Sequence, residues 1–154
     1  MKRFLATAAS AVVLALGATA ASAQSPSEQI GFGFTAGQLT GGHVAYALSP
    51  GLHIGTGFGM QIQEGNNIVY FAPYAKFLLK GPKELKPFFM AQFEVASGGG
   101  TSTTGLSVSG GGEYFVTPNV GIYGQIALVS IQFDPSVTAL GLLRPSVGIE
   151  WFLD

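Results

Sequence analysis

The segment LHIGTGFGMQIQ, residues 52–63, decides the fold class of this chain. Large apolar side chains alternate along it with small or polar ones, so that Ile54 and Phe58 share one face while His53 and Gln61 share the other. Period-two alternation of this kind is typical of a β-strand with two chemically different faces. The segment therefore predicts a strand that meets an apolar medium on one side only.

Seven further runs of the same kind flank this segment, and they are separated by short breaks rich in Gly, Pro, Asn, Asp or Ser. Such breaks are typical of the turns between antiparallel strands. The eight runs are residues 29–38, 42–49, 51–63, 67–80, 86–97, 104–117, 119–133 and 138–153. The sequence therefore predicts an all-β chain of eight strands joined by short turns.

The composition indicates which medium the apolar faces meet. Charged residues make up 10% of the chain, against about 25% in an ordinary soluble domain. A soluble sandwich would bury the apolar faces between two sheets and would need charges on its other faces, which here carry mostly Gly, Ser and Gln. A membrane barrel turns the apolar faces to lipid and closes on itself, because hydrocarbon does not tolerate open strand edges. We predict an eight-stranded antiparallel transmembrane up-and-down barrel.

The first 23 residues have the features of a secretory signal peptide. A basic pair stands at positions 2 and 3, an uncharged apolar stretch follows, and Ala21 and Ala23 form an A-x-A cleavage site. We expect cleavage after Ala23, which assigns residues 1–23 to the signal peptide and residues 24–154 to the barrel domain. Removal of the leader leaves five basic residues against eight acidic ones, which excludes the basic surface of a nucleic-acid-binding protein.

Two short segments resemble a known family. The stretch YFVTPNV, residues 114–120, resembles a strand–turn–strand segment common in the outer-membrane β-barrel domain family, the small OmpA-like or "porin family" barrels. The stretch SVGIEWFL, residues 146–153, is similar to the barrel-assembly signal of that class. The polar, glycine and two apolar positions of this signal are taken by Ser146, Gly148, Trp151 and Leu153. The chain departs from the family pattern at Asp154, because the family usually stops on an aromatic residue.

The resemblance implies a place in the outer membrane of a Gram-negative cell envelope, reached after export to the periplasm. It implies outer-membrane lipids and the barrel-assembly machinery as partners of a monomer. Because the chain has no cysteine and no phosphate-binding glycine motif, we expect neither cofactor nor metal. The breaks near residues 49–50, 81–84 and 117–119 are then expected on the periplasmic side. The leading function is structural, in the integrity of the envelope. The alternatives are a narrow pore for small solutes and surface adhesion through the loop at residues 97–104, the longest outer loop expected.

Five charged residues are expected to face the lumen, because a Lys or Arg facing lipid at mid-bilayer would cost about 2–4 kcal/mol. They are Lys76, Glu94, Glu113, Arg144 and Glu150. The polar residues expected beside them are His53, Gln61, Tyr74, Gln92 and Gln125. Three carboxylates and two cations can form an ion-pair network that fills the lumen, and a gated pore or ion path is the alternative. Since the loss of one partner leaves a buried charge uncompensated, we expect Arg144→Ala to lower the thermal stability of the barrel.

The histidines do not form a recognisable catalytic set. Small barrels that deacylate lipid A use a His, a Ser and an acidic residue near the outer rim, and carboxylates can act as general acids or bases. His43 is followed two positions later by Ala45, and His53 by Gly55, so neither begins a His-x-Ser arrangement. Ser49 lies well along the strand that His43 begins. We therefore expect no enzymatic activity, and we interpret a lone histidine near a rim as a polar interface residue.

Ten aromatic residues are expected on the outer face, some of them in the aromatic belts that mark the two membrane interfaces. They are Phe32, Phe34, Tyr46, Phe58, Phe71, Phe77, Phe89, Phe93, Tyr114 and Trp151. Lys80, Lys83 and Lys86 cluster around one turn. We expect these lysines to be solvated there, or to contact anionic lipid head groups.

Overall fold

The structure of the protein is a computed structural model. It describes residues 25–37, 40–63, 66–82, 84–133, 138–141 and 144–154. The predicted signal peptide, residues 1–23 with the cleavage residues Ala21 and Ala23, lies outside the described residues, as does Lys83. Within the described part of the chain, no helix is both long enough and apolar enough to cross a membrane.

The described residues form nine strands, which follow the predicted runs closely. They are β1 (Gln29–Gly37), β2 (Gly41–Ser49), β3 (Leu52–Gln63), β4 (Asn66–Leu78), β5 (Leu85–Gly98), β6 (Thr101–Thr117), β7 (Val120–Phe133), β8 (Thr138–Gly141) and β9 (Arg144–Phe152). Seven of the predicted runs correspond to single strands, and the eighth corresponds to β8 together with β9. The breaks between runs therefore fall where the sequence places them.

The sheet closes into a barrel. Each strand from β1 to β7 pairs antiparallel with the next, and β9 pairs with both β7 and β1. The pairs Ser130↔Gly141 of β7–β8 and Ala127↔Arg144 of β7–β9 keep one register. Since β8 and β9 continue the same ladder, they are two parts of a single eighth strand. The predicted fold class, an eight-stranded antiparallel up-and-down barrel, is confirmed.

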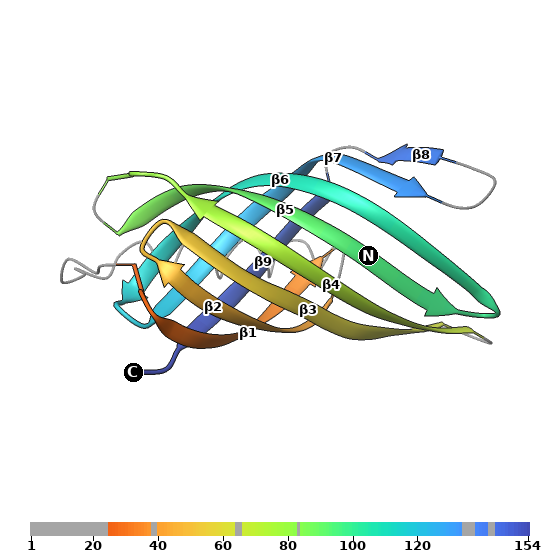
Figure 1. The fold of residues 1–154 in the computed structure, drawn as a ribbon, viewed down its shortest axis with the longest axis horizontal. Helices are drawn as coiled ribbons and strands as arrows, with labels where there is room; N and C mark the ends of the chain where they lie inside the picture. The colour runs from red at the N-terminus through yellow and green to blue at the C-terminus, as the bar shows by residue number, and fades with distance from the viewer. Residues whose placement is uncertain (1–24, 38–39, 64–65, 83, 134–137, 142–143) are drawn as a thin grey trace, which may run out of the picture.

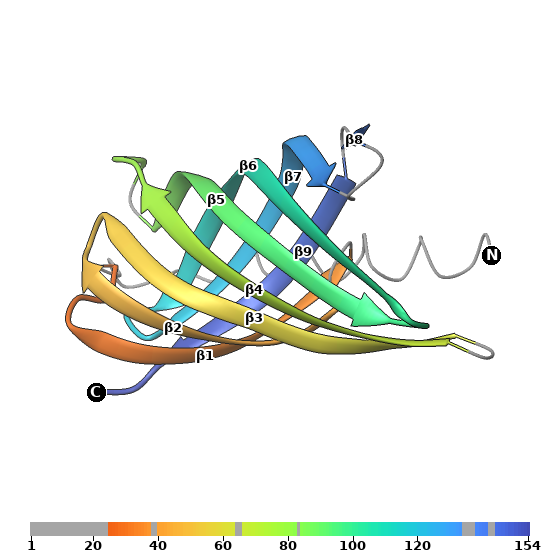
Figure 2. The same ribbon diagram turned by 45° about the vertical axis from the view of Figure 1, so that its right-hand side comes forward.

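The barrel has two distinct ends, which Figures 1 and 2 show from two directions. The terminal end (left in Figure 1) holds the C-terminus and the turns that join β2 to β3, β4 to β5 and β6 to β7. The turn that joins β5 to β6 lies at the opposite, distal end. The strands are strongly tilted between these ends, as closure of a barrel requires.

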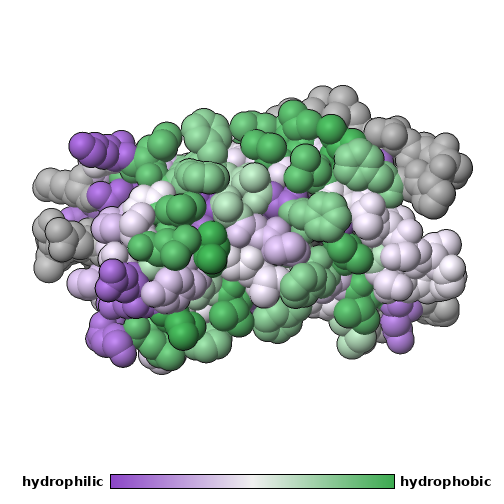
Figure 3. Space-filling view, viewed as in Figure 1, coloured by the Kyte–Doolittle hydropathy of each residue, from purple (hydrophilic) through white to green (hydrophobic). Residues whose placement is uncertain are grey.

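The outside of the barrel is apolar around its circumference, because β1 to β7 and β9 all present exposed large apolar side chains. Nine of the ten aromatic residues predicted on the outer face are exposed, and the tenth, Tyr114, is half-buried. Trp151 reaches 62% exposure. Figure 3 shows hydrophobic residues gathered over the middle of the wall, with strongly hydrophilic residues mostly toward the terminal end. Such a wall suits hydrocarbon and is unfavourable in water.

One β-bulge in β7 changes which residues face inward. Val108 pairs with Val129 while the next residue, Ser109, pairs with Ala127, so Leu128 is the extra residue. Leu128 and Val129 are consecutive and both face outward. A bulge of this kind reverses the alternation beyond it. Ala127 therefore faces the lumen on the terminal side of the bulge, and the inward position on its distal side is Ser130.

The segment SGGGTSTT, residues 97–104, predicted as the longest outer loop, is mostly strand. β5 continues to Gly98 and β6 begins at Thr101, so only two residues connect them. Gly99 and Gly100 have φ angles of 59° and 79°. Two consecutive positive φ values define a hairpin turn whose twist matches that of the flanking strands. The predicted loop is therefore a tight hairpin, because adjacent glycines allow the Ser- and Thr-rich flanks to stay paired.

Candidate functional site in the barrel lumen

The terminal half of the lumen is filled by apolar side chains. Phe88 of β5, Phe115 of β6 and Phe152 of β9 are all at most 2% exposed and belong to one buried cluster with Leu78 of β4. Each lies within a few residues of a terminal turn or of the C-terminus, at an inward position of its strand. The ring of His53 packs edge-on against Phe152, with 5.1 Å between ring centroids. These rings form an apolar plug at the terminal end.

A buried ion cluster lies next to this plug. The Lys76 Nζ of β4 donates to Glu113 Oε2 of β6 at 3.0 Å and to Glu150 Oε2 of β9 at 2.6 Å. All three side chains are at most 2% exposed. The ammonium also lies 5.1 Å from the ring centroid of Tyr123 and 5.5 Å from that of Phe88, where ring faces attract a cation. Lys76 thus links β4, β6 and β9, no two of which are neighbours in the sheet.

The cluster continues through further polar groups toward the distal end. His43 Nε2 lies 3.2 Å from Glu150 Oε1, within ion-pair distance but outside the geometry of a directed hydrogen bond. Thr35 Oγ1 lies 3.3 Å from His43 Nδ1 and 2.5 Å from the Tyr123 hydroxyl. The residues Tyr123, Thr35, His43 and Glu150 therefore form a polar chain that ends at Lys76.

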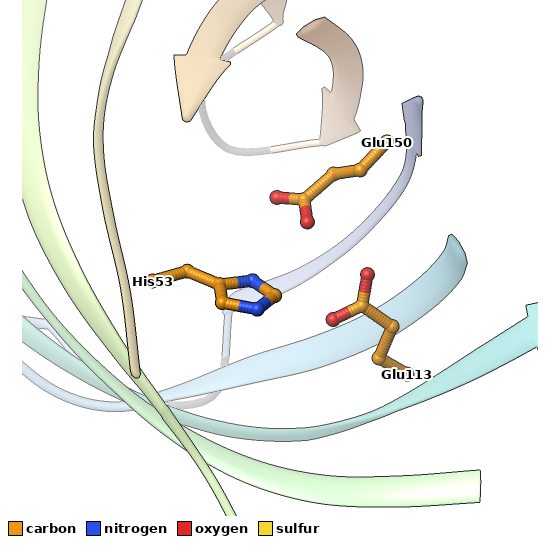
Figure 4. Close-up of side chains that lie close together, drawn as sticks. All are labelled: His53, Glu113 and Glu150. Carbon is orange, nitrogen blue, oxygen red and sulfur yellow. The ribbon is translucent and has the colours of Figure 1, made fainter. Parts of the chain in front are cut away.

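His53, Glu113 and Glu150 also converge in the lumen, as Figure 4 shows. One nitrogen or oxygen from each lies within 4.8 Å of the others, and these are donor types that Zn²⁺ accepts. Lys76 Nζ, however, is bonded to the same two carboxylates. A divalent cation placed there would be repelled by the buried ammonium at short range. We therefore assign the cationic role in this cluster to Lys76 and assign no metal.

The structure brings together only part of the predicted charge network. Lys76, Glu113 and Glu150 meet, but among the described residues no ion pair joins Glu94 or Arg144 to them. Glu94 Oε1 instead accepts a hydrogen bond from Ser107 Oγ at 3.0 Å. The Arg144 side chain is exposed and lines the lumen nearer the distal end. The prediction of one five-membered network is corrected, because the stagger of the strands separates charges that share the inner face.

The polar residues predicted beside the network take different places. His53 is fully buried. Tyr74, Gln92 and Gln125 line an inner cavity that also reaches Lys76. The side chain of Gln61 lies outside the described part of the structure.

The sequence does not identify His43, Thr35 and Tyr123 as members of the polar chain. His43 is 4% exposed, so it is a lumen residue and the interpretation of it as a rim residue is wrong. Period-two alternation along the strand predicts this position, because it places His43 on the same face as Ala45 and Ala47, which are both buried. The Ser49 hydroxyl accepts from the backbone N–H of Gly51, and no hydrogen bond among the described residues joins it to His43.

The residues of the predicted assembly signal alternate between the two faces of β9 and its extension. Ser146 is buried, Gly148 is half-buried, and both Trp151 and Leu153 are exposed on the outer face. The carboxylate of Asp154 accepts from Asn119 Nδ2 at 2.6 Å and from Gln29 Nε2 at 3.2 Å. The residue that departs from the family pattern therefore ties the last strand to β1 and to the β6–β7 turn.

Two adjoining cavities lie in the described part of the lumen. The distal cavity has a volume of about 440 Å³ and the inner cavity about 50 Å³. Both are lined by Tyr70, Glu94 and Arg144, which form a neck between them. The inner cavity reaches as far as Lys76 and Glu150. The lumen therefore narrows from the distal end toward the ion cluster, and both polar and apolar side chains line it.

Solved structures with the same fold support this architecture. The N-terminal β-barrel domain of Pseudomonas aeruginosa OprF matches with a TM-score of 0.66 and 14% identity, over 82% of this chain and 98% of that domain. Neisserial surface protein A matches with a TM-score of 0.53 and 16% identity, over 81% and 94%. A de novo designed transmembrane β-barrel matches with a TM-score of 0.53 and 19% identity, over 84% and 99%. No protein-family model and no curated protein matches the sequence. The chain has the fold of the eight-stranded outer-membrane barrels.

Proposed function

We propose that this chain is a small integral outer-membrane β-barrel protein with a structural role in the cell envelope. The observation that supports this role is the pairing of an apolar wall with a filled terminal lumen. The wall favours insertion into a bilayer, since exposed apolar side chains occur on all sides of the barrel. The lumen contains an apolar plug and a buried ion cluster, which favours a stable membrane element over a conduit.

A narrow pore has less support than the structural role. An ion that crossed the barrel would have to pass Lys76, Glu113 and Glu150, which hold one another at 2.6 to 3.0 Å, and then the buried rings of Phe115 and Phe152. Surface adhesion through residues 97–104 also has less support, since that segment is a two-residue turn between paired strands.

The route and partners form part of the proposal. Export would follow the signal peptide, with cleavage after Ala23, and the barrel-assembly machinery would recognise the last strand through Ser146, Gly148, Trp151 and Leu153. Outer-membrane lipids would cover the apolar wall of a monomer. An Ala21→Asp/Ala23→Asp variant should keep its leader and fail to reach the outer-membrane fraction of a density gradient. Mature wild-type protein should begin at Gln24 by mass spectrometry.

Planar-bilayer recording tests the filled lumen directly. The wild-type barrel should insert without stable open steps. A Phe88→Ala/Phe115→Ala/Phe152→Ala variant, checked for compact migration on a cold gel, serves as the comparison with a weakened plug. Stable open steps of defined size in the wild-type protein would overturn the structural role in favour of the pore.

A further inference from the structure

The distal cavity has the size and lining of a small-molecule site. Its volume of about 440 Å³ lies within the range of about 300–1,000 Å³ common for ligand pockets. Polar residues from several strands line it, including Thr103, Thr104 and Gln132, together with the apolar residues Met60, Ile68 and Ile131. The neck below it is formed by Tyr70, Glu94 and Arg144. A solute that enters from the distal end would therefore meet charged groups before it reaches the inner cavity.

Two opposite charges face this neck without pairing with each other. Glu94 uses Oε1 to accept from Ser107 and has a second oxygen available to accept. Arg144 presents a guanidinium with five N–H donors, and no ion pair within the described residues engages it. An anion at Arg144 would be repelled by Glu94, and a cation at Glu94 would be repelled by Arg144. A ligand with both charges is attracted by both residues.

The inner cavity adds a second, independent feature. Its volume of about 50 Å³ accommodates a group of one or two water-sized units, at about 30 Å³ per water. The hydroxyl of Tyr74 and Oε1 of Gln125 are buried polar atoms without a hydrogen-bond partner among the described residues, and both residues line this cavity. Since unpaired buried polar atoms are costly, a short hydrogen-bonding group that extended past the neck would be stabilised there.

We propose that the distal half of the lumen is a binding site for a small zwitterion of the α-amino-acid class. Arg144 binds its carboxylate, Glu94 binds its ammonium group, and a short polar side chain reaches Tyr74 and Gln125. The site goes beyond the structural role and does not depend on it. A ligand can bind in a lumen that is filled at the terminal end without passing through the barrel.

Three related probes separate the two charges of the ligand. L-serine carries both charges, N-acetyl-L-serine lacks the cation, and L-serinamide lacks the anion. Each is titrated into the full barrel in detergent micelles and followed by ¹H–¹⁵N NMR. L-serine should give saturable shifts at the neck residues Tyr70 and Glu94, with an apparent Kd at least about tenfold lower than that of either analogue, a difference of about 1.4 kcal/mol.

Charge-neutral variants assign the contacts. Arg144→Gln should weaken L-serine binding at least about tenfold and should not weaken L-serinamide binding, because it removes the charge that repels this cation. Glu94→Gln should weaken L-serine binding equally and should not weaken N-acetyl-L-serine binding, because it removes the charge that repels this anion. The amide oxygen of the new side chain can still accept from Ser107. Lys80→Gln, at the exposed terminal end, is the matched control and should bind L-serine like wild type. Compact migration on a cold gel confirms that each variant is folded.

Three outcomes overturn the proposal. The first is the absence of saturable shifts with L-serine in the folded wild-type barrel. The second is equal binding of all three probes, and the third is L-serine binding that Arg144→Gln and Glu94→Gln leave unchanged. None of these outcomes bears on the filled lumen, which the bilayer recording tests separately.

Discussion

The two halves of the lumen are built from the same alternating strands, but their inward charges have different surroundings. In the terminal half, the charges of Lys76, Glu113 and Glu150 contact one another and are enclosed by Phe88 and other apolar rings. In the distal half, Arg144 is exposed to a cavity and makes no ion pair with its described neighbours. The difference teaches that an inward charge is structural where the lumen is filled around it and available for binding where it is not.

Removal of Lys76 should have the largest effect on this contrast. Lys76→Met leaves Glu113 and Glu150 buried without their cation, and the loss of one partner of a buried ion pair costs about 3–5 kcal/mol. We expect a fall of that size in the free energy of unfolding, measured by urea titration of the barrel in lipid vesicles. Lys80→Met, which removes an exposed lysine from the same chain segment, should change it by less than about 0.5 kcal/mol.

A compensating variant shows whether uncompensated charge is the cause. Lys76→Met/Glu113→Gln/Glu150→Gln removes the carboxylate charges together with the ammonium, and replacement of a whole buried ion cluster is often neutral. This triple variant should therefore be more stable than Lys76→Met alone. A triple variant as unstable as the single one would show that packing around Lys76, and not its charge, supports the terminal half.

The sequence predicts the fold well because each face of each strand is encoded locally. The alternation of Phe88 with Phe89, or of Glu150 with Trp151, places one side chain inside and the next outside, as the structure has them. Which inward charges meet is a different matter. Lys76 reaches β6 and β9 across the lumen, and this contact depends on the stagger of strands around the barrel. Period-two alternation carries no information about stagger.

Substitution of a lumen glycine should have an intermediate effect. A Cβ at Gly33 would overlap the backbone oxygen of Ile149 and Nε2 of His43, whereas a Cβ at Gly124 would meet no atom within 4 Å. Overpacking typically costs about 1–3 kcal/mol. Gly33→Ala should lower the unfolding free energy by that amount, and Gly124→Ala should leave it nearly unchanged. Equal effects of the two substitutions would mean that backbone freedom, and not lumen space, requires glycine at Gly33.

The hydroxyl of Ser107 should contribute less than the lumen glycine. It donates to Glu94 Oε1 at 3.0 Å, and a single hydrogen bond contributes about 1 kcal/mol net. Ser107→Ala should lower the unfolding free energy by about that amount. A double-mutant cycle with Glu94→Ala isolates the coupling between the two side chains, and the absence of coupling would show that Glu94 does not depend on Ser107.

Arg144 is where the sequence and the structure lead to opposite expectations. Both agree that it shares the inward parity of Glu150, and from parity alone Arg144→Ala should destabilise the barrel. In the structure Arg144 pairs with Ala127, toward the distal cavity, while Glu150 pairs with Gly121 near the terminal turn. Because its side chain is exposed, its removal leaves no buried charge behind. Arg144→Ala should therefore change the unfolding free energy by less than about 0.5 kcal/mol, the smallest effect of the series. A loss comparable to that of Lys76→Met, seen as melting of the compact form at lower temperature on a gel, would place Arg144 in the ion cluster after all and remove the basis for a separate distal site.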